Sequence, residues 1–213
     1  MDIDLETGPT AADEGVRGWS RFAPLTGLAF FVLLMASAIS AGQAPVAGDS
    51  GARVLQLFGA HPRVEKVSNL LAGLGVVFLV FFAAWFASEL RRCGALSLAP
   101  AVFGGAVILA AGGAARAGIG WSLASGHTKI SPAAAQALNE LFYSHYPAII
   151  GIAVFMFASW LAILQTRVVP VWLGWLALLI GLVAISPPTL APLIASGVWI
   201  SIVAVMMTVR APH

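Results

Sequence analysis

Residues 67–90 read VSNLLAGLGVVFLVFFAAWFASEL, and this stretch decides the fold class. Its only charged residue is Glu89, near the end. A membrane-spanning helix needs about 20 mostly apolar residues. Closed β-barrels are the other way to cross a bilayer, but their strands alternate apolar and polar residues and this run does not. The stretch therefore predicts a transmembrane helix.

Five further apolar stretches of similar character surround it, which predicts an all-α polytopic transmembrane helical bundle with six spans. A proline lies near the start of four of the predicted helices, where a missing backbone N–H costs little. Pro187-Pro188 separates the last two spans, and Thr189 is a candidate N-cap for the final one. The other predicted spans are 24–41, 96–119, 146–165, 169–185 and 189–209.

The composition of the 213 residues agrees with a membrane protein. Hydrophobic residues make up 60% of the chain and charged residues only 9%, against roughly 25% charged residues in soluble domains. The net charge of +2 and the lack of a Lys/Arg run give no indication of nucleic-acid binding. Cys93 is the single cysteine, which excludes an intramolecular disulfide and a Cys-based metal site.

The N-terminal segment differs from the rest of the chain. Residues 1–20 are polar and acidic, so they do not have the positive n-region of a signal peptide. We expect a disordered cytoplasmic tail here, followed by a single transmembrane domain at 21–213.

Two of the predicted connections, 42–66 and 120–145, are long enough to hold a short amphipathic helix each. In the second, Ser131-Pro132 is a cap followed by a first helical residue, and apolar residues then recur at helical spacing. In the first, Asp49 or Ser50 is the candidate cap for a helix with Val54 and Phe58 on one side. We expect both helices to lie on the membrane interface or to cover one end of the bundle.

The distribution of Lys and Arg indicates an orientation by the positive-inside rule. With the N-terminus in the cytoplasm, six basic residues fall inside and five outside. The inner residues lie close to helix ends, whereas several outer ones lie in the long loops. We therefore expect a multi-pass protein of the cell membrane with both termini in the cytoplasm. The inner set is Arg17, Arg21, Arg91, Arg92, Arg167 and Arg210, and the outer set is Arg53, Arg63, Lys66, Arg116 and Lys129.

The polar residues that could bind a ligand or take part in a reaction gather at the predicted outer face. Arg116 lies late in a predicted span, and ionisable residues at such depth are candidates for function. Glu65 and Glu140 are the nearest predicted acids, and pairing with either would fasten a loop to the bundle. Asn69 is an amide inside the second span, able to hydrogen-bond across helices. With His145, these residues form the candidate ligand-binding set.

Metal binding is a weaker hypothesis for the same face. His61 and His145, with Glu65 or Glu140, are the side chains that zinc-like ions favour. Pro62 interrupts the spacing between His61 and Glu65, and the chain has no His-Glu-x-x-His motif. No ionisable residue lies at a predicted bilayer centre, and the common nucleophile and phosphate-binding motifs are absent from the sequence. We therefore predict no catalytic residue and no cofactor.

Several short stretches resemble a broad group of small bacterial membrane proteins with a shared domain to which no activity is assigned. The most recognisable piece is Pro170 to Trp175, PVWLGW. The resemblance implies a six-helix fold in the cell membrane and implies no reaction. The other resembling stretches are Arg21–Phe31 (RFAPLTGLAFF), Phe86–Arg92 (FASELRR), Ala135–Leu141 (AQALNEL) and Val169–Leu179 (VPVWLGWLALL).

Three functions remain open at this point. The first is binding of a lipid, a small hydrophobic molecule or a protein partner through the outer helices, with membrane lipids as partners and a homo-oligomer allowed. The second is a small-molecule transporter or channel, supported by Arg116 and by a weak parallel repeat between 82–92 and 157–167, in which Trp85 matches Trp160. The third is a membrane enzyme or metal-binding protein that uses the outer-face His, Glu and Arg residues.

Overall fold

The computed structural model describes residues 22–43, 45–144, 146–186 and 191–210. This part of the chain is helical and contains no β-strand, which confirms the predicted all-α class. The predicted tail at 1–20, Pro187-Pro188 and Thr189 lie outside the described residues. The helices are α2 (Leu25–Ser40), α3 (Gly51–Ala60), α4 (Pro62–Arg92), α5 (Ala99–Gly126), α6 (Pro132–Tyr143), α7 (Tyr146–Thr166), α8 (Val171–Ile185) and α9 (Ala191–Arg210).

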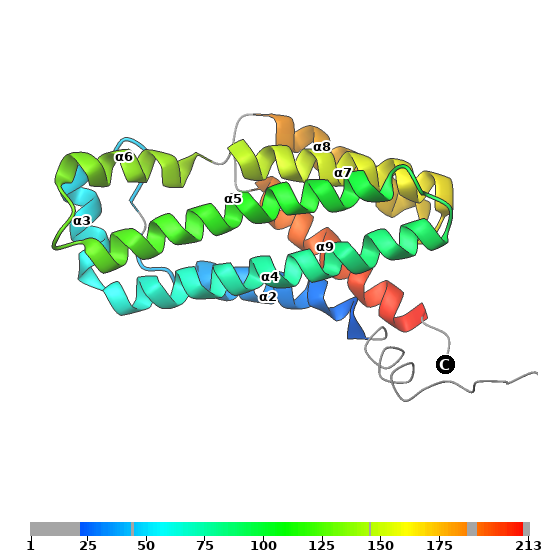
Figure 1. Ribbon diagram of the computed structural model, residues 1–213, viewed down its shortest axis with the longest axis horizontal. Coiled ribbons are helices and arrows are strands. Elements are labelled where there is room, and N and C mark those ends of the chain that lie inside the picture. Colours follow the sequence, from blue (N-terminus) through cyan, green and yellow to red (C-terminus); the bar gives the residue numbers. More distant parts are fainter. Residues whose placement is uncertain (1–21, 44, 145, 187–190, 211–213) are drawn as a thin grey trace, which may run out of the picture.

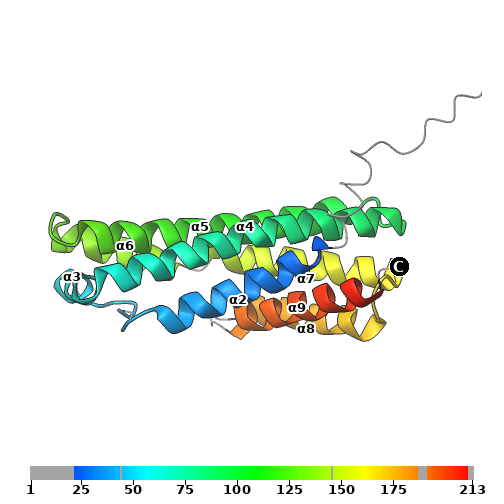
Figure 2. The same cartoon turned by 90° about the horizontal axis from the view of Figure 1, so that it is seen from below.

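Six apolar helices form a closed ring. Going around it, α2 contacts α4, α4 contacts α5, α5 contacts α7, α7 contacts α8, α8 contacts α9, and α9 returns to α2. Figure 2 shows α4 and α5 on one side of this bundle and α2, α8 and α9 on the other. The two remaining helices, α3 and α6, lie together at one end (Figure 1). We call this the α3–α6 end.

Four helical segments are long and apolar enough to cross a membrane. They are α4 with 31 residues, α5 with 28, α7 with 21, and Ala191–Val209 in α9. The apolar helices α2 and α8 have only 16 and 15 residues, so they are about 24 and 23 Å long at 1.5 Å per residue, against a hydrocarbon core of about 30 Å. The predicted six spans thus match six apolar helices, of which four have spanning length.

The outer surface of the bundle is apolar where a soluble protein would be polar. On α4, Leu70, Leu74, Val77 and Phe81 follow one another at helical spacing and are 44–57% exposed. Such a continuous exposed apolar stripe is costly in water and suits contact with lipid chains. The surface therefore agrees with the spanning lengths in indicating a membrane protein.

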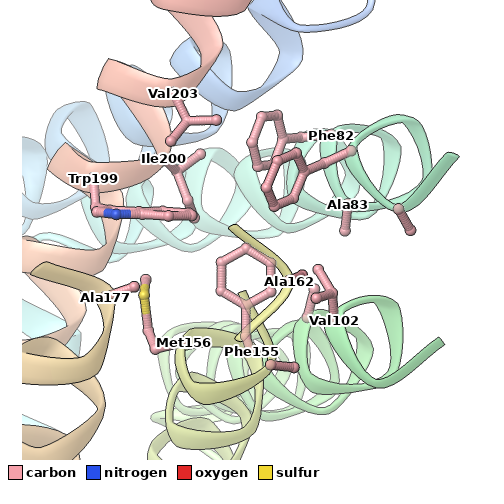
Figure 3. Close-up of a cluster of buried hydrophobic side chains, with 14 of the residues drawn as sticks. Phe82, Ala83, Val102, Phe155, Met156, Ala162, Ala177, Trp199, Ile200 and Val203 are labelled. Atoms are coloured by element: carbon pink, nitrogen blue, oxygen red, sulfur yellow. The ribbon is translucent and has the colours of Figure 1, made fainter. Parts of the chain in front are cut away.

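The ring is filled by large side chains in the half away from the α3–α6 end. Figure 3 shows Trp199 of α9 close to Phe155 of α7, with Phe82 of α4 nearby. The Trp199 ring meets Phe155 edge-on at 5.9 Å and Phe86 at 6.2 Å between centroids. Its indole N–H donates to the Leu173 carbonyl of α8 at 2.8 Å, so this buried donor has a partner. One tryptophan thus joins α4, α7, α8 and α9.

Glycines allow α5 and α7 to approach closely. A Cβ added at Gly105 would lie 2.4 Å from the backbone nitrogen of Phe155, and one at Gly151 would lie 2.3 Å from that of Leu109. Small residues at such crossings are the usual means of packing membrane helices. The two glycines therefore serve close packing of α5 and α7.

Both predicted amphipathic helices are present and both caps are confirmed. The hydroxyl oxygen of Ser50 accepts from the backbone N–H of Arg53, and that of Ser131 accepts from Ala134. The two helices pack on each other and on the end of α5 around Val54, Phe58 and a few further side chains. That small second core consists of Val54, Phe58, Leu123, Ala124 and Ala135.

Two predicted boundaries were wrong at this end. The second span was predicted to begin at Val67, but α4 begins at Pro62 directly after α3. The third was predicted to end at Ile119, but α5 continues to Gly126. For α5 the physical reason is that its buried face continues: Gly120 lies against Asn69 of α4, and Leu123 and Ala124 pack in the small core shared with α3 and α6.

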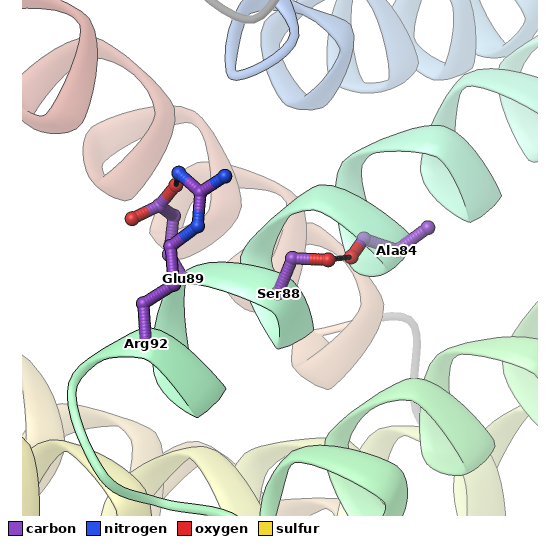
Figure 4. A network of polar contacts seen from close by, with 4 residues as sticks. All are labelled: Ala84, Ser88, Glu89 and Arg92. Carbon is purple, nitrogen blue, oxygen red and sulfur yellow. Dashed lines mark hydrogen bonds and ion pairs between the residues drawn. The ribbon is translucent and has the colours of Figure 1, made fainter. Parts of the chain in front are cut away.

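At the opposite end, α4 finishes in an intrahelical ion pair between Glu89 and Arg92. Arg92 donates to the Glu89 carboxylate at 3.0 Å, and the Ser88 hydroxyl donates to the Ala84 carbonyl of its own helix (Figure 4). The Arg92 side chain is 74% exposed, so the pair is solvated. Pairs of this kind contribute less than about 1 kcal/mol, which agrees with a border role and no functional one.

Candidate ligand cavity

A cavity of about 400 Å³ occupies the half of the ring next to the α3–α6 end. Its walls come from α2, α4 and α5, with the first turns of α7 and α9 closing one side. Residues of α6, together with Ala41, Gly42, Gln43 and Pro45, cover the end. Small-molecule sites in proteins are concavities of roughly 300–1,000 Å³. The volume therefore suits one small molecule or a single lipid chain.

The cavity extends along α4 and α5 and is lined by one face of each helix. On α4 the lining residues begin at Glu65 and end at Leu79, and on α5 they begin at Leu109 and end at Arg116 and Ala117. Between these ends the lining residues of α4 and α5 include Ala72, Gly112 and Gly113. Ala72 leaves space because its side chain is small, whereas Gly112 and Gly113 lie close against Ala148 of α7 and Val76 of α4. In the other half of the ring, large residues fill the interior.

The deep end of the cavity is apolar. Phe30, Leu79 and Leu109 line it and also belong to the main hydrophobic core. They separate the cavity from the packed aromatic cluster around Trp199. The cavity is therefore closed at this depth by side chains that cannot hydrogen-bond to a ligand.

Arg116 lies at the other, polar end. Its guanidinium carbon is 4.1 Å from the centroid of the Phe142 ring, a cation–π contact between α5 and α6. Its Nε is buried and has no hydrogen-bond partner. Among the described residues no carboxylate lies within the 4.0 Å limit of an ion pair with it. Arg116 is thus a partly buried cation without a counter-ion in the part of the chain that the structure describes.

Glu65 lies at the same end, on the neighbouring helix α4. Its side chain is only 9% exposed, and its Oε1 accepts from the backbone N–H of Gly42 at 3.0 Å. A carboxylate has about four acceptor positions, so this bond leaves most of its capacity unused. Arg116 and Glu65 are the charged residues among the described ones that line the cavity.

Neutral polar groups complete the polar end. The Ser68 hydroxyl donates to the Ser37 carbonyl at 2.9 Å and joins α4 to α2. Asn69 donates its amide to the Glu65 carbonyl at 2.8 Å. The Asn69 side chain also lies against α5, where a Cβ on Gly120 would be 2.3 Å from its Oδ1. The described structure therefore shows no hydrogen bond from Asn69 to another helix, contrary to the prediction: its Nδ2 bonds within its own helix, and its contact with α5 is one of packing.

The segment between α2 and α3 is fastened across the end of the cavity by α6. The Asn139 amide donates to the Val46 carbonyl at 3.0 Å, and the Tyr143 hydroxyl donates to the carbonyl of Pro45. The backbone N–H of Gly48 donates to Glu140 at 2.9 Å. Residues 45–48 and α6 therefore act together as a cover.

The structure brings together only part of the predicted site set. Arg116, Glu65 and Asn69 line the cavity. Glu140 is exposed and holds the cover segment by its bond to Gly48. His61 is exposed between α3 and α4 and does not line the cavity, and His145 lies outside the described residues.

His127 is the other histidine among the described residues, and it does not support the metal hypothesis. His127 lies against Gly59 of α3, and its Nδ1 is 3.0 Å from the Ala124 carbonyl, so it takes part in packing this end. Among the described residues no group of three or more His, Cys, Asp and Glu side chains could hold a metal ion. The described residues therefore offer no support for a metal centre.

Sequence reasoning missed the apolar walls of the cavity. Phe30, Leu34 and Ala38 of α2 line it, yet no pattern distinguishes them from other apolar residues in the same helix. Their spacing of four residues places them on one face, but the face toward the cavity is only known once α2 is docked against α4.

Comparisons with known protein families, with curated proteins and with solved structures found no match.

Proposed function

We propose that this protein is a membrane protein that binds a lipid or another small amphipathic molecule inside the bundle. The observation that carries the proposal is the cavity itself, which has Arg116 and Glu65 at one end and Phe30, Leu79 and Leu109 at the other. An amphipathic molecule has the same division, and placing its chain along the apolar walls removes apolar surface from water.

The packed half of the ring supports binding over conduction. Beyond the deep end of the cavity the interior is filled by Phe82, Phe86, Phe155 and Trp199, all fully buried. A conducting path needs polar groups or water along its length. Among the described residues, the polar groups facing the cavity lie at its α3–α6 side, so the arrangement fits a blind pocket.

The proposal includes a topology. We propose six spans in the cell membrane, with α2 and α8 crossing in spite of their short length and with both termini in the cytoplasm. A short helix is accommodated by local thinning of the bilayer at a modest cost.

The experiment is photo-crosslinking with a single-chain lipid that carries a diazirine near the end of its chain. The purified protein in detergent is irradiated, and labelled peptides are mapped by mass spectrometry. We expect adducts on the cavity face of α4 and α5, near Leu79 and Leu109. Adducts only on the exposed stripe around Leu70 and Leu74 would overturn the proposal.

A matched pair of variants tests whether the cavity is the site. Ala72→Phe places a large ring in the cavity, whereas Ala84→Phe places the same ring on the exposed face of the same helix. We expect the first to remove the cavity adducts and the second to retain them. Ala38→Phe on α2 fills the cavity from another wall and replaces Ala72→Phe if that variant does not fold.

A further inference from the structure

The two charged residues of the cavity carry information about the ligand's head group. Arg116 and Glu65 line the same end of the cavity from adjacent helices, and yet they form no ion pair within 4.0 Å. A buried charge is costly unless it is paired and hydrogen-bonded. Among the described residues neither group has a partner of opposite charge, and this needs a physical explanation at a shared cavity.

Each residue is held in place by its own neighbour. The guanidinium of Arg116 lies on the face of Phe142 of α6, and the carboxylate of Glu65 is bonded to the backbone N–H of Gly42 after α2. These contacts come from different elements, so they position the positive and the negative group independently. Groups held apart in this way are organised in advance for a ligand that fits between them.

We infer that the ligand is a zwitterionic single-chain amphiphile, whose anionic group binds Arg116 and whose cationic group binds Glu65. This inference rests on the proposed binding function and names its ligand class. The described charged lining sums to zero, +1 from Arg116 and −1 from Glu65. A purely anionic head would leave the Glu65 carboxylate unpaired beside a like charge, and a purely cationic head would do the same to Arg116.

The walls limit the apolar part of the ligand. Leu79 is fourteen residues from Glu65 on α4, and Leu109 is seven from Arg116 on α5. At 1.5 Å per residue, the apolar depth below the charged end is about 10 to 21 Å. A cavity of about 400 Å³ over such a depth is narrow. It therefore suits one chain.

Displacement of the photo-probe by four compounds with the same dodecyl chain tests the inference. Their heads are phosphocholine, phosphate, trimethylammonium and maltose. In the wild-type protein we expect phosphocholine to displace the probe at a mole fraction about tenfold below the others, since it alone gives both buried charges a partner: its phosphate accepts hydrogen bonds from Arg116, and its trimethylammonium, which has no N–H, pairs with Glu65 by charge. Phosphocholine without a chain, at equal concentration, is expected to displace nothing.

Two neutralising variants make the assignment specific to the residues. Glu65→Gln should shift the preference to the phosphate head, and Arg116→Gln should shift it to the trimethylammonium head. Arg63→Gln neutralises an exposed arginine near Glu65 that does not line the cavity, and it should leave the order unchanged.

The outcomes separate this inference from the proposed function. If no compound displaces the probe and no cavity adduct forms, the binding function itself is wrong. If the four heads act equally in the wild type and both variants, binding stands and the zwitterion assignment is wrong. A wild-type preference for phosphate would also overturn it in favour of an anion site. Displacement by phosphocholine without a chain would overturn the amphiphile class.

Discussion

The guanidinium of Arg116 in α5 lies on the ring of Phe142 in α6, with 4.1 Å between the guanidinium carbon and the ring centroid. This contact joins the cover at the α3–α6 end to the main bundle, at the polar end of the cavity. Phe142 also meets Phe58 of α3 edge-on at 6.2 Å. The pair therefore links the site to the stability of both short helices.

The first prediction concerns this contact. Phe142→Met retains an apolar side chain but removes the ring, and cation–π contacts contribute about 0.5–2 kcal/mol. We expect a lower thermal midpoint in detergent and faster amide hydrogen exchange in α6. Leu141→Met changes a neighbouring residue that is 59% exposed. Equal exchange rates in the two variants would show that the contact does not hold the cover.

The second prediction concerns the α5–α7 crossing. Gly105→Ala puts a Cβ 2.4 Å from the Phe155 nitrogen, so the helices must separate, and overpacking of this kind costs about 1–3 kcal/mol. We expect a clear loss of thermal stability. Gly104→Ala is the control, because nothing lies within 4 Å of a Cβ at that position. A loss at Gly104 as large as at Gly105 would contradict the close crossing.

The third prediction concerns the hydrogen bonds between α2 and α4. Ser68→Ala removes the donor to the Ser37 carbonyl and the contact between the two hydroxyls at 3.2 Å. Interhelical bonds in membranes are worth about 0.6 kcal/mol on average and up to about 1.7. We expect the free energy of unfolding to fall by about that amount, measured by denaturant unfolding in detergent. Ser88→Ala, whose hydroxyl bonds within α4, should show none of it. A Ser68 variant as stable as the Ser88 variant would contradict a contribution from this link.

The fourth prediction tests the proposed topology with the native cysteine. Cys93 is exposed in the connection between α4 and α5, which lies in the cytoplasm if the N-terminus is inside and α2 and α4 both cross. A membrane-impermeant maleimide should label it only after permeabilisation. Ser50→Cys in a Cys93→Ser background should be labelled in intact cells. The reverse pattern would invert the orientation, and equal labelling of both would mean that α4 does not cross.

Much of the fold could be predicted locally. The apolar runs located the six helices of the ring, and Ser50 and Ser131 located the starts of the two short helices, because an N-cap acts within one turn. The ends of α4 and α5 could not be predicted in this way. Their extensions carry mixed residues such as Glu65 and Trp121, whose contacts come from other parts of the fold: Glu65 accepts from the backbone N–H of Gly42, and the Lys66 ammonium lies 5.9 Å from the centroid of the Trp121 ring.

Part of the site could also be predicted locally, whereas its contacts between distant residues could not. Arg116, Glu65 and Asn69 were recognised because an ionisable or amide group near a span is costly wherever it lies. The sequence did not show that Arg116 contacts Phe142, or that Glu65 binds the N–H of Gly42. Those partners lie 26 and 23 residues away in the chain, and contacts at that separation depend on how the helices dock.

The stretch 67–90 thus indicated by itself that the chain forms a membrane helix. In lipid an unpaired backbone N–H or C=O is costly, and a helix pairs these groups within a single apolar run. The tertiary structure alone decided that the ring is packed in one half and hollow in the other. That difference depends on which residues face inward at each depth, Phe82 and Trp199 in one half and Ala72 and Gly113 in the other. It arises from the relative rotation of the helices, which no single helix specifies.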